Sequence, residues 1–131
     1  MIVGIGTDLC DIRRIEQARS RFPLNFDKKI LTYREREELS ARSEKNAYVA
    51  QRFAAKEAIY KAFHFSDQNS LGWQQAEILN QGKKGAPVVH LYGNCLSKLN
   101  QQLAVGQTGA IHLSLTDEYP YVIAYVILEK I

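Results

Sequence analysis

The stretch RFAAKEAIYKAF, residues 52–63, lies in the middle of the chain and contains no residue that breaks a helix. Residues 44–64 around it also lack Gly and Pro, which predicts one long helix over this region. Alanine is the strongest helix former, and its small side chain lets another segment or a ligand approach closely. We therefore expect a long central helix.

Charged residues occupy specific positions on this helix. Glu57 and Lys61 stand four residues apart with Glu on the N-terminal side, the favourable order for an exposed ion pair worth about 0.2–0.5 kcal/mol. Lys56 neighbours Glu57, and Arg52 lies five residues before it. Two interpretations remain open: a solvated helix face, or a set of groups that share a ligand.

Size and composition indicate one soluble domain over residues 1–131, since 46% of the chain is hydrophobic and 24% charged. The net charge of +3 favours anionic ligands or an acidic partner. The sequence has no run of five or more basic residues, so nucleic-acid binding is not expected.

The cysteines and the terminal segments predict a cytoplasmic protein. Cys10 and Cys95 lie far apart without a CxxC motif, which indicates free thiols in a reducing compartment. The opening MIVGIGTDLC has no basic segment and reaches Asp8 early, unlike a signal peptide. The longest apolar run, YVIAYVIL, is far shorter than the ~20 residues needed to span a bilayer, so no membrane partner is expected.

The N-terminal half reads as a strand followed by helices. Residues 2–7, IVGIGT, predict a strand that runs into Asp8. Asp11 is a good N-cap for a helix that ends by about Phe22, before a proline. A short amphipathic segment follows at 24–31.

Another helix is expected through Leu39, because Thr32 and Glu35 have the spacing of a capping box. Residues 65–73 have the composition of a loop, and strands are expected at 74–80 and 88–92 around a turn at 80–87.

The C-terminal part predicts a helix and two strands. Asn94 is a candidate cap for a helix with a stripe of Leu96, Leu99 and Leu103, and Gly106 lies past its end. Residues 110–116, AIHLSLT, alternate apolar and polar side chains as a half-buried strand does.

The last strand, YVIAYVILE at 121–129, is apolar on both faces. An antiparallel sheet often leaves one face wet, so the second apolar face indicates either a subunit interface or burial in a two-layer core. With helices preceding most strands, the fold class is α+β with an antiparallel sheet.

The opening GIGTD is an incomplete nucleotide motif. Gly4 and Gly6 lack the third glycine of the dinucleotide fingerprint, because position 9 is Leu, and the chain has no P-loop. Asp8 is either a capping or turn carboxylate, or a group that meets a metal ion or substrate. His112 shares a strand face with Ser114, but no third group is placed to complete a catalytic triad.

Taken together, GIGTDLCDIRRIE (4–16) and QRFAAKEAIYKAF (51–63) resemble the two signature segments of the holo-[acyl-carrier-protein] synthases, small 4′-phosphopantetheinyl transferases. ILTYRE (30–35) and the tail HLSLTDEYPYVIAYVILE (112–129) resemble the same family, so the likeness covers nearly the whole chain. Residues 64–69 replace the family's Gly-Thr-Gly loop, which leaves the coenzyme A contacts and the choice of carrier open. The family's G-K-P turn reads Gly-Ala-Pro at 85–87.

The resemblance implies transfer of the 4′-phosphopantetheine arm of coenzyme A to a carrier serine, with release of 3′,5′-ADP. It also implies an α+β homotrimer with active sites between subunits. Asp8 and Glu57 match the family's Mg²⁺ ligands, and either is a candidate general base. Lys61 matches the lysine that stabilises or protonates the departing phosphate.

The same resemblance supplies binding roles. Arg52 and Lys56, together with Lys61, are candidates for the coenzyme A phosphates. His112 matches a histidine near the ligand at the subunit boundary. Arg13, Arg14 and Arg21, with Arg19 between them, are candidates for an acidic acyl carrier protein, or else form a solvated helix end. Two rival functions remain: a transferase for a specialised polyketide or polyunsaturated-fatty-acid carrier, and a catalytically idle protein that binds coenzyme A or a carrier.

Overall fold

The computed structural model describes residues 1–64, 72–81 and 85–131 of the chain. Five strands, five α-helices and one short 3-10 helix follow one another in these residues. In chain order they are β1 (Ile2–Asp11), α1 (Ile12–Arg21), α2 (Asn25–Ile30), α3 (Tyr33–Ser40), α4 (Lys45–Ala62), η2 (Trp73–Gln75), β2 (Ala76–Asn80), β3 (Pro87–Leu91), α5 (Gly93–Gln101), β4 (Gly109–Glu118) and β5 (Tyr121–Lys130).

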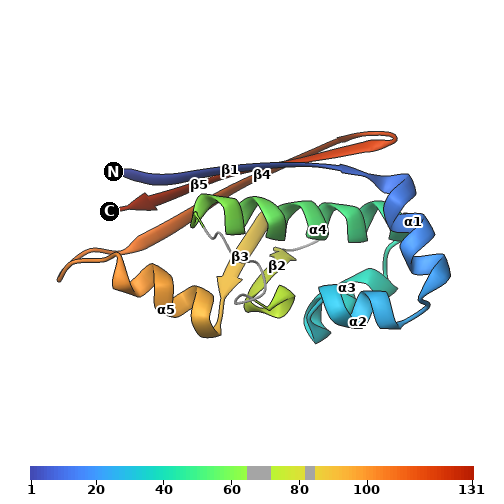
Figure 1. Cartoon of the computed structure of the whole chain (residues 1–131), viewed down its shortest axis with the longest axis horizontal. Helices are drawn as coiled ribbons and strands as arrows, with labels where there is room; N and C mark the ends of the chain where they lie inside the picture. Colours follow the sequence, from blue (N-terminus) through green and yellow to red (C-terminus); the bar gives the residue numbers. More distant parts are fainter. Residues whose placement is uncertain (65–71, 82–84) are drawn as a thin grey trace.

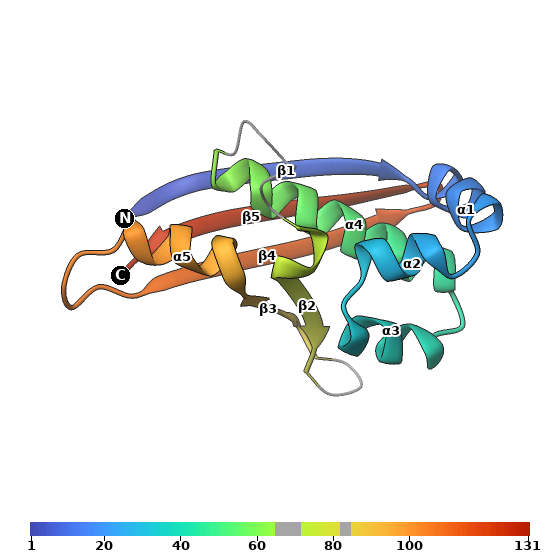
Figure 2. The same cartoon turned by 60° about the horizontal axis from the view of Figure 1, so that its bottom comes forward.

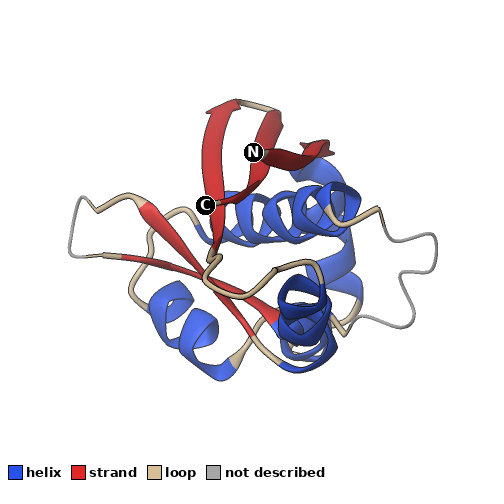
Figure 3. Ribbon diagram, turned by 90° about the vertical axis from the view of Figure 1, so that its left-hand side faces the viewer, coloured by secondary structure: helices blue, strands red, loops and turns tan. Residues whose placement is uncertain are grey.

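Two antiparallel sheets lie on different sides of helix α4. The larger sheet has the strand order β1-β5-β4, and the smaller one is the β2–β3 hairpin. Helix α4 runs along one face of the larger sheet, with the hairpin and the remaining helices beyond it (Figure 1 and Figure 3). The predicted α+β class, with an antiparallel sheet packed on a long central helix, is confirmed.

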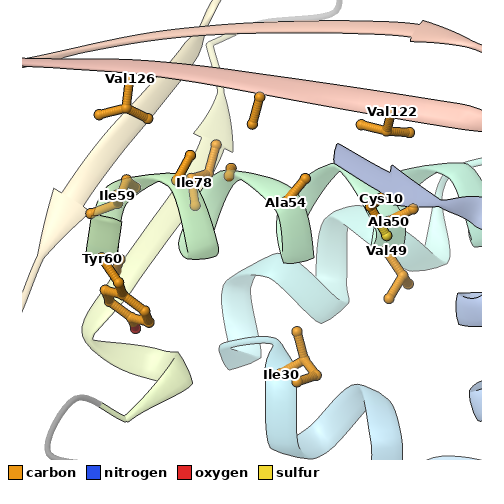
Figure 4. Close-up of a cluster of buried hydrophobic side chains, with 14 of the residues drawn as sticks. Cys10, Ile30, Val49, Ala50, Ala54, Ile59, Tyr60, Ile78, Val122 and Val126 are labelled. Atoms are coloured by element: carbon orange, nitrogen blue, oxygen red, sulfur yellow. The ribbon is translucent and has the colours of Figure 1, made fainter. Parts of the chain in front are cut away.

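Helix α4 is central, because residues on nearly all of its sides are buried. Its buried residues lie around the whole circumference of the helix, as expected when neighbours cover every face. Val122 and Val126 project from β5 toward Ala54 and Ile59 of α4 (Figure 4), and all four side chains are almost completely buried. Each larger aliphatic side chain buried here contributes about 1.5–3 kcal/mol.

The predicted caps of the N-terminal helices are present. The Asp11 carboxylate accepts a hydrogen bond from the Arg13 amide at 2.9 Å and caps α1. At the start of α3, the Glu35 amide donates to Thr32 Oγ1 at 3.2 Å and the Thr32 amide donates to Glu35 Oε1 at 2.9 Å. Both halves of the predicted capping box are therefore confirmed. Helices α1, α2 and α3 gather at the N-terminal end of α4, and α5 lies toward its other end (Figure 2).

The first strand is longer than predicted. It continues to Asp11, because residues 8–11 pair with β5, and Asp8 stands opposite Ala124 in the middle of the strand. Asp8 is thus not at the end of an element.

The prediction that Asn94 caps the next helix is wrong. Helix α5 begins at Gly93, and its N-cap Tyr92 makes no side-chain cap. The helix ends at Gln101, so Leu103 lies beyond it, and Leu96 is 40% exposed. Only Leu99 of the predicted stripe is buried. Most of the predicted loop at 65–73, including the altered segment at 64–69, and the centre of the turn at 80–87 lie outside the described residues.

The outer face of the larger sheet carries exposed apolar side chains. On β5, Val122 and Ala124 point into the core, whereas Tyr121, Ile123 and Tyr125 alternate with them and are 41–50% exposed. The expectation of a two-layer core that buries both faces of this strand is therefore wrong for the single chain. In the part of the chain that the structure describes, no helix is long and apolar enough to cross a membrane.

Candidate active site

The site starts from an unusually close approach of β1 to α4. A Cβ atom at Gly4 would lie 1.9 Å from the Ala62 carbonyl oxygen, and one at Gly6 would lie 1.8 Å from that of Ala58. Any side chain at either position would push the strand away from the helix. The glycines of GIGTD thus serve strand–helix packing.

This packing brings Asp8 to the helix. Alternate residues of a strand share a face, so Asp8 points to the same side as Gly4 and Gly6, toward α4. The Lys61 ammonium lies 3.1 Å from Asp8 Oδ1 and also donates to the Thr7 carbonyl oxygen at 3.1 Å. The Asp8 side chain is 15% exposed and that of Lys61 is 52% exposed. A carboxylate and an ammonium group from distant parts of the chain therefore meet at the surface.

Glu57 lies on the same face of α4 as Lys61, one helical turn earlier, and is half-buried. This face flanks the Ala58 and Ala62 stripe that touches β1. Two of the three predicted catalytic residues, Asp8 and Lys61, are in direct contact, and Glu57 adjoins Lys61 along the helix.

The acidic groups suit a hard cation that shares its ligands with a substrate. Mg²⁺ takes oxygen ligands and is usually held by one or two carboxylates, with phosphate oxygens and water completing an octahedron. Asp8 and Glu57 offer such a donor set. Among the described residues, no three His, Cys, Asp or Glu side chains cluster as a metal site.

Lys56 does not reach this surface. It is completely buried, and its ammonium donates to Glu35 Oε1 at 2.7 Å and to the Trp73 carbonyl oxygen at 2.8 Å. Burial lowers the pKa of Lys56, and the adjacent Glu35 carboxylate opposes that shift. A phosphate has no access to this ammonium, so its burial contradicts the predicted coenzyme A contact.

Arg52 is also part of the core. Only 1% of it is exposed, and it donates to Glu38 and to Asn80, with its guanidinium carbon 4.4 Å from the centre of the Tyr48 ring. Its predicted contact with a coenzyme A phosphate is contradicted for the same reason. The sequence did not indicate these partners, because Glu38 and Asn80 meet Arg52 only in the folded chain.

His112 lies on the opposite face of the sheet from Asp8. It is exposed on the outer face of β4, and its Nε2 is 3.1 Å from Glu129 Oε1. Strand β5 separates β4 from β1. Within one chain the structure therefore does not bring His112 to Asp8.

The basic residues of α1 are mostly at the surface. Arg13, Arg14 and Arg21 are exposed, and Arg13 forms an ion pair with Asp11 at 2.7 Å. The Arg13 guanidinium lowers the pKa of the Asp11 carboxyl below its usual value. Arg19, in contrast, is half-buried and donates to Asp27 at 2.9 Å, which makes it a packing residue.

An apolar groove opens between α2 and α4. It has a volume of about 420 Å³ and is lined by Phe22, Asn25, Phe26, Lys29, Ile30, Phe53 and Trp73. Phe53 precedes Glu57 by four residues and thus shares its helix face. Sequence reasoning did not find Trp73, whose stacking partner Phe53 lies 20 residues earlier in the chain.

Comparisons with known proteins agree with this fold. Residues 4–124 match the model of a family described as the 4′-phosphopantetheinyl transferase superfamily. A holo-[acyl-carrier-protein] synthase of Methylorubrum populi is 40% identical over all 131 residues, which cover 96% of that protein.

Solved structures are similar over the same length. The holo-[acyl-carrier-protein] synthase of Neisseria meningitidis matches with a TM-score of 0.84 and 35% identity, covering 98% of this chain and 99% of that one. A Bacillus anthracis synthase solved in complex with coenzyme A (3′,5′-ADP) matches with a TM-score of 0.77 and 30% identity, over 98% and 97% of the two chains. Because family, sequence and fold agree over nearly its whole length, the chain belongs to the 4′-phosphopantetheinyl transferase superfamily.

Proposed function

We propose that this chain transfers the 4′-phosphopantetheine arm of coenzyme A to a serine of an apo-acyl carrier protein, producing holo-carrier and 3′,5′-ADP. The observation that carries the proposal is the Asp8–Lys61 contact beside Glu57, formed where β1 packs on α4. The membership of the transferase superfamily and the names of the relatives support it. The product feeds fatty acid biosynthesis.

The reaction breaks one bond of the coenzyme A diphosphate. The serine oxygen forms a new bond to the β-phosphorus, and the bond from that phosphorus to the bridging oxygen breaks, so 3′,5′-ADP leaves. The serine proton passes to a carboxylate, Glu57 or Asp8. The obstacle is the negative charge of the diphosphate, and catalysis consists mainly of positioning and of charge stabilisation.

Lys61 is the exposed cation of the site. Its ammonium lies at the end of a flexible side chain and contacts Asp8, so it can turn toward a phosphate oxygen. There it stabilises the charge that develops on the leaving group and can donate a proton to it. Asp8 and Glu57 would hold Mg²⁺, which supplies further charge neutralisation on the phosphate oxygens.

The active unit is proposed to be a homotrimer with sites between subunits. The exposed apolar face formed by Ile5, Leu9, Tyr121, Ile123 and Tyr125 supports this, because a second copy would cover it. His112 lies on that same outer face of the sheet, so it can serve only a neighbouring protomer's site. We therefore propose that His112 contacts coenzyme A bound at the site of a neighbouring protomer.

The carrier is proposed to dock on α1. Arg13, Arg14 and Arg21 give this helix an exposed positive face, which suits an acidic carrier. The free thiols Cys10 and Cys95 suit a reducing compartment, and we propose a cytoplasmic location.

The test is the intact mass of an apo-acyl carrier protein incubated with this protein, coenzyme A and Mg²⁺. A gain of one phosphopantetheine arm supports transfer, and a reaction without coenzyme A is the control. A gain seen only with a polyketide or polyunsaturated-fatty-acid carrier would identify the specialised alternative. Binding of coenzyme A with no gain on any carrier would contradict transfer and favour an idle binding protein.

A further inference from the structure

Two hydrogen bonds hold the segment Gly72–Trp73 against helix α4. The Lys56 ammonium donates to the Trp73 carbonyl oxygen at 2.8 Å, and the Tyr60 hydroxyl donates to the Gly72 carbonyl oxygen at 2.6 Å. Lys56 and Tyr60 are four residues apart and therefore share one face of the helix. The carbonyl groups of two successive residues thus accept hydrogen bonds from one face of α4.

The buried Lys56 ammonium does more than pair with Glu35. The Lys56–Glu35 ion pair has no exposed side-chain surface on either partner. Removing two charges from water costs free energy that their attraction repays only in part, and apolar pairs of similar size are often as stable or more so. The Lys56 ammonium also donates a hydrogen bond to the Trp73 carbonyl oxygen, which fixes the position of that backbone group.

Trp73 of this segment packs on Phe53, which lies one helical turn before Glu57 of the candidate active site. The Trp73 ring stacks on the Phe53 ring with a centroid distance of 4.9 Å. The centre of the Tyr60 ring lies 6.3 Å from that of Trp73. The rings of Phe53 and Trp73 line the groove of about 420 Å³. Lys56 and Tyr60 thus hold the Gly72–Trp73 backbone on the side of α4 that adjoins Glu57.

We infer that Lys56 and Tyr60 are positioning residues for the transfer reaction, which act by fixing Gly72–Trp73 against α4 beside Glu57. The inference rests on the proposed function. Both side chains are buried, so they act through the position of Trp73 rather than by contact with the substrate. Small misplacements of groups that orient a substrate reduce rates strongly, since an error of about 1 Å can cost about 100-fold.

The test combines kinetics with the fluorescence of Trp73, the only tryptophan of the chain. Tyr60→Phe removes one hydroxyl and is expected to lower kcat/KM by about 2- to 10-fold. Lys56→Met removes the ammonium and is expected to lower kcat/KM by about 10- to 100-fold. In both variants the emission maximum of Trp73 should shift, because its ring is held less firmly.

Lys45→Met is the matched control. Lys45 is on the same helix and donates to the backbone carbonyls of Leu39, Ser40 and Arg42 rather than to those of Gly72 and Trp73. This variant should keep the native Trp73 emission and the native kcat/KM. Activities are expressed per folded molecule, using urea unfolding curves, so that loss of stability is not read as loss of positioning.

Native kcat/KM per folded molecule in Tyr60→Phe or in folded Lys56→Met would overturn the inference, whether or not the Trp73 emission shifts. Lys56→Met leaves the Glu35 carboxylate buried without its cation; where it fails to fold, Tyr60→Phe decides alone. The fluorescence also separates this failure from that of the proposed function. If the unaltered protein transfers nothing, the proposed function fails. Unshifted Trp73 emission in the variants would instead show that Lys56 and Tyr60 do not hold Gly72–Trp73 in place.

Discussion

The ammonium of Lys61 lies 3.1 Å from Oδ1 of Asp8, although the two residues are separated by 53 positions in the chain. Their meeting depends on β1 approaching α4 through backbone atoms, with glycine on the strand and alanine on the helix. Glu57 lies one turn away on the same helix face as Lys61. The close packing of β1 on α4 thus brings together the charged groups that the proposed reaction needs.

Lys61→Met should lower kcat about 100- to 1,000-fold, because it removes the exposed cation that stabilises charge on the departing phosphate. The fold should persist, since exposed ion pairs contribute at most about 1 kcal/mol. Steady-state transfer assays and a urea unfolding curve measure the two effects. Native kcat in this variant would remove Lys61 from its assigned role, and Lys45→Met is the control for loss of a lysine on this helix.

Gly6→Ala should destabilise the protein by about 1–3 kcal/mol or more, because the new methyl group would collide with the Ala58 carbonyl oxygen. The free energy of unfolding, measured in urea, reports the change. Gly72→Ala is the matched control, since among the described residues its methyl group would meet only Gln75, at 3.6 Å. Equal stability of Gly6→Ala and the unaltered chain would show that the strand does not need glycine there.

The thiols should be unreactive in the folded protein at pH 8. Burial raises the pKa of Cys10 to about 11 and that of Cys95 to about 12, from an ordinary value of 9.0. A disulfide reagent that reports thiolate by absorbance should react slowly with native protein and with both thiols in urea. Immediate reaction of both thiols in native protein would contradict their burial.

The same shifts give stability a pH dependence. Because the folded-state pKa of each thiol lies above its unfolded value, the contribution of the neutral thiols is fully present below pH 9. It is lost as the pH rises from about 9 toward 11. The free energy of unfolding should thus fall between about pH 9 and 11, the window set by the unfolded and folded pKa values of Cys10, and Cys10→Ala should reduce the slope. An unchanged slope in that variant would speak against the assignment.

Tyr125→Glu should reduce the oligomeric mass, because it places a charge on the apolar outer face of the sheet. Light scattering coupled to size-exclusion chromatography measures the mass. Tyr33→Glu, at an exposed tyrosine on α3, is the control and should leave the mass unchanged. An unaltered mass in Tyr125→Glu would mean that this face is not the subunit interface.

Local signals in the sequence predicted much of the fold. The Asp11 cap, the Thr32–Glu35 box and the absence of helix breakers in α4 are encoded within a few residues of each element, and all three are confirmed. The candidate residues Asp8, Glu57 and Lys61 came from two separated motifs, and the structure joins Asp8 to Lys61.

What the sequence could not predict depends on distant partners. Lys56 looks like a solvated charge until Glu35 is brought against it from 21 residues away. Likewise, the purpose of Gly6 is visible only once Ala58 lies over it. Trp73 follows a polar loop and has no periodic signal, so its place beside Phe53 had no local indication.

The most direct test of the central claim is the intact mass of an apo-carrier after incubation with coenzyme A, Mg²⁺ and either the unaltered protein or Glu57→Gln. One added phosphopantetheine arm is expected with the unaltered protein and none with Glu57→Gln, and both proteins should unfold at the same urea concentration. Full modification of the carrier by Glu57→Gln would show that Glu57 is not needed for transfer.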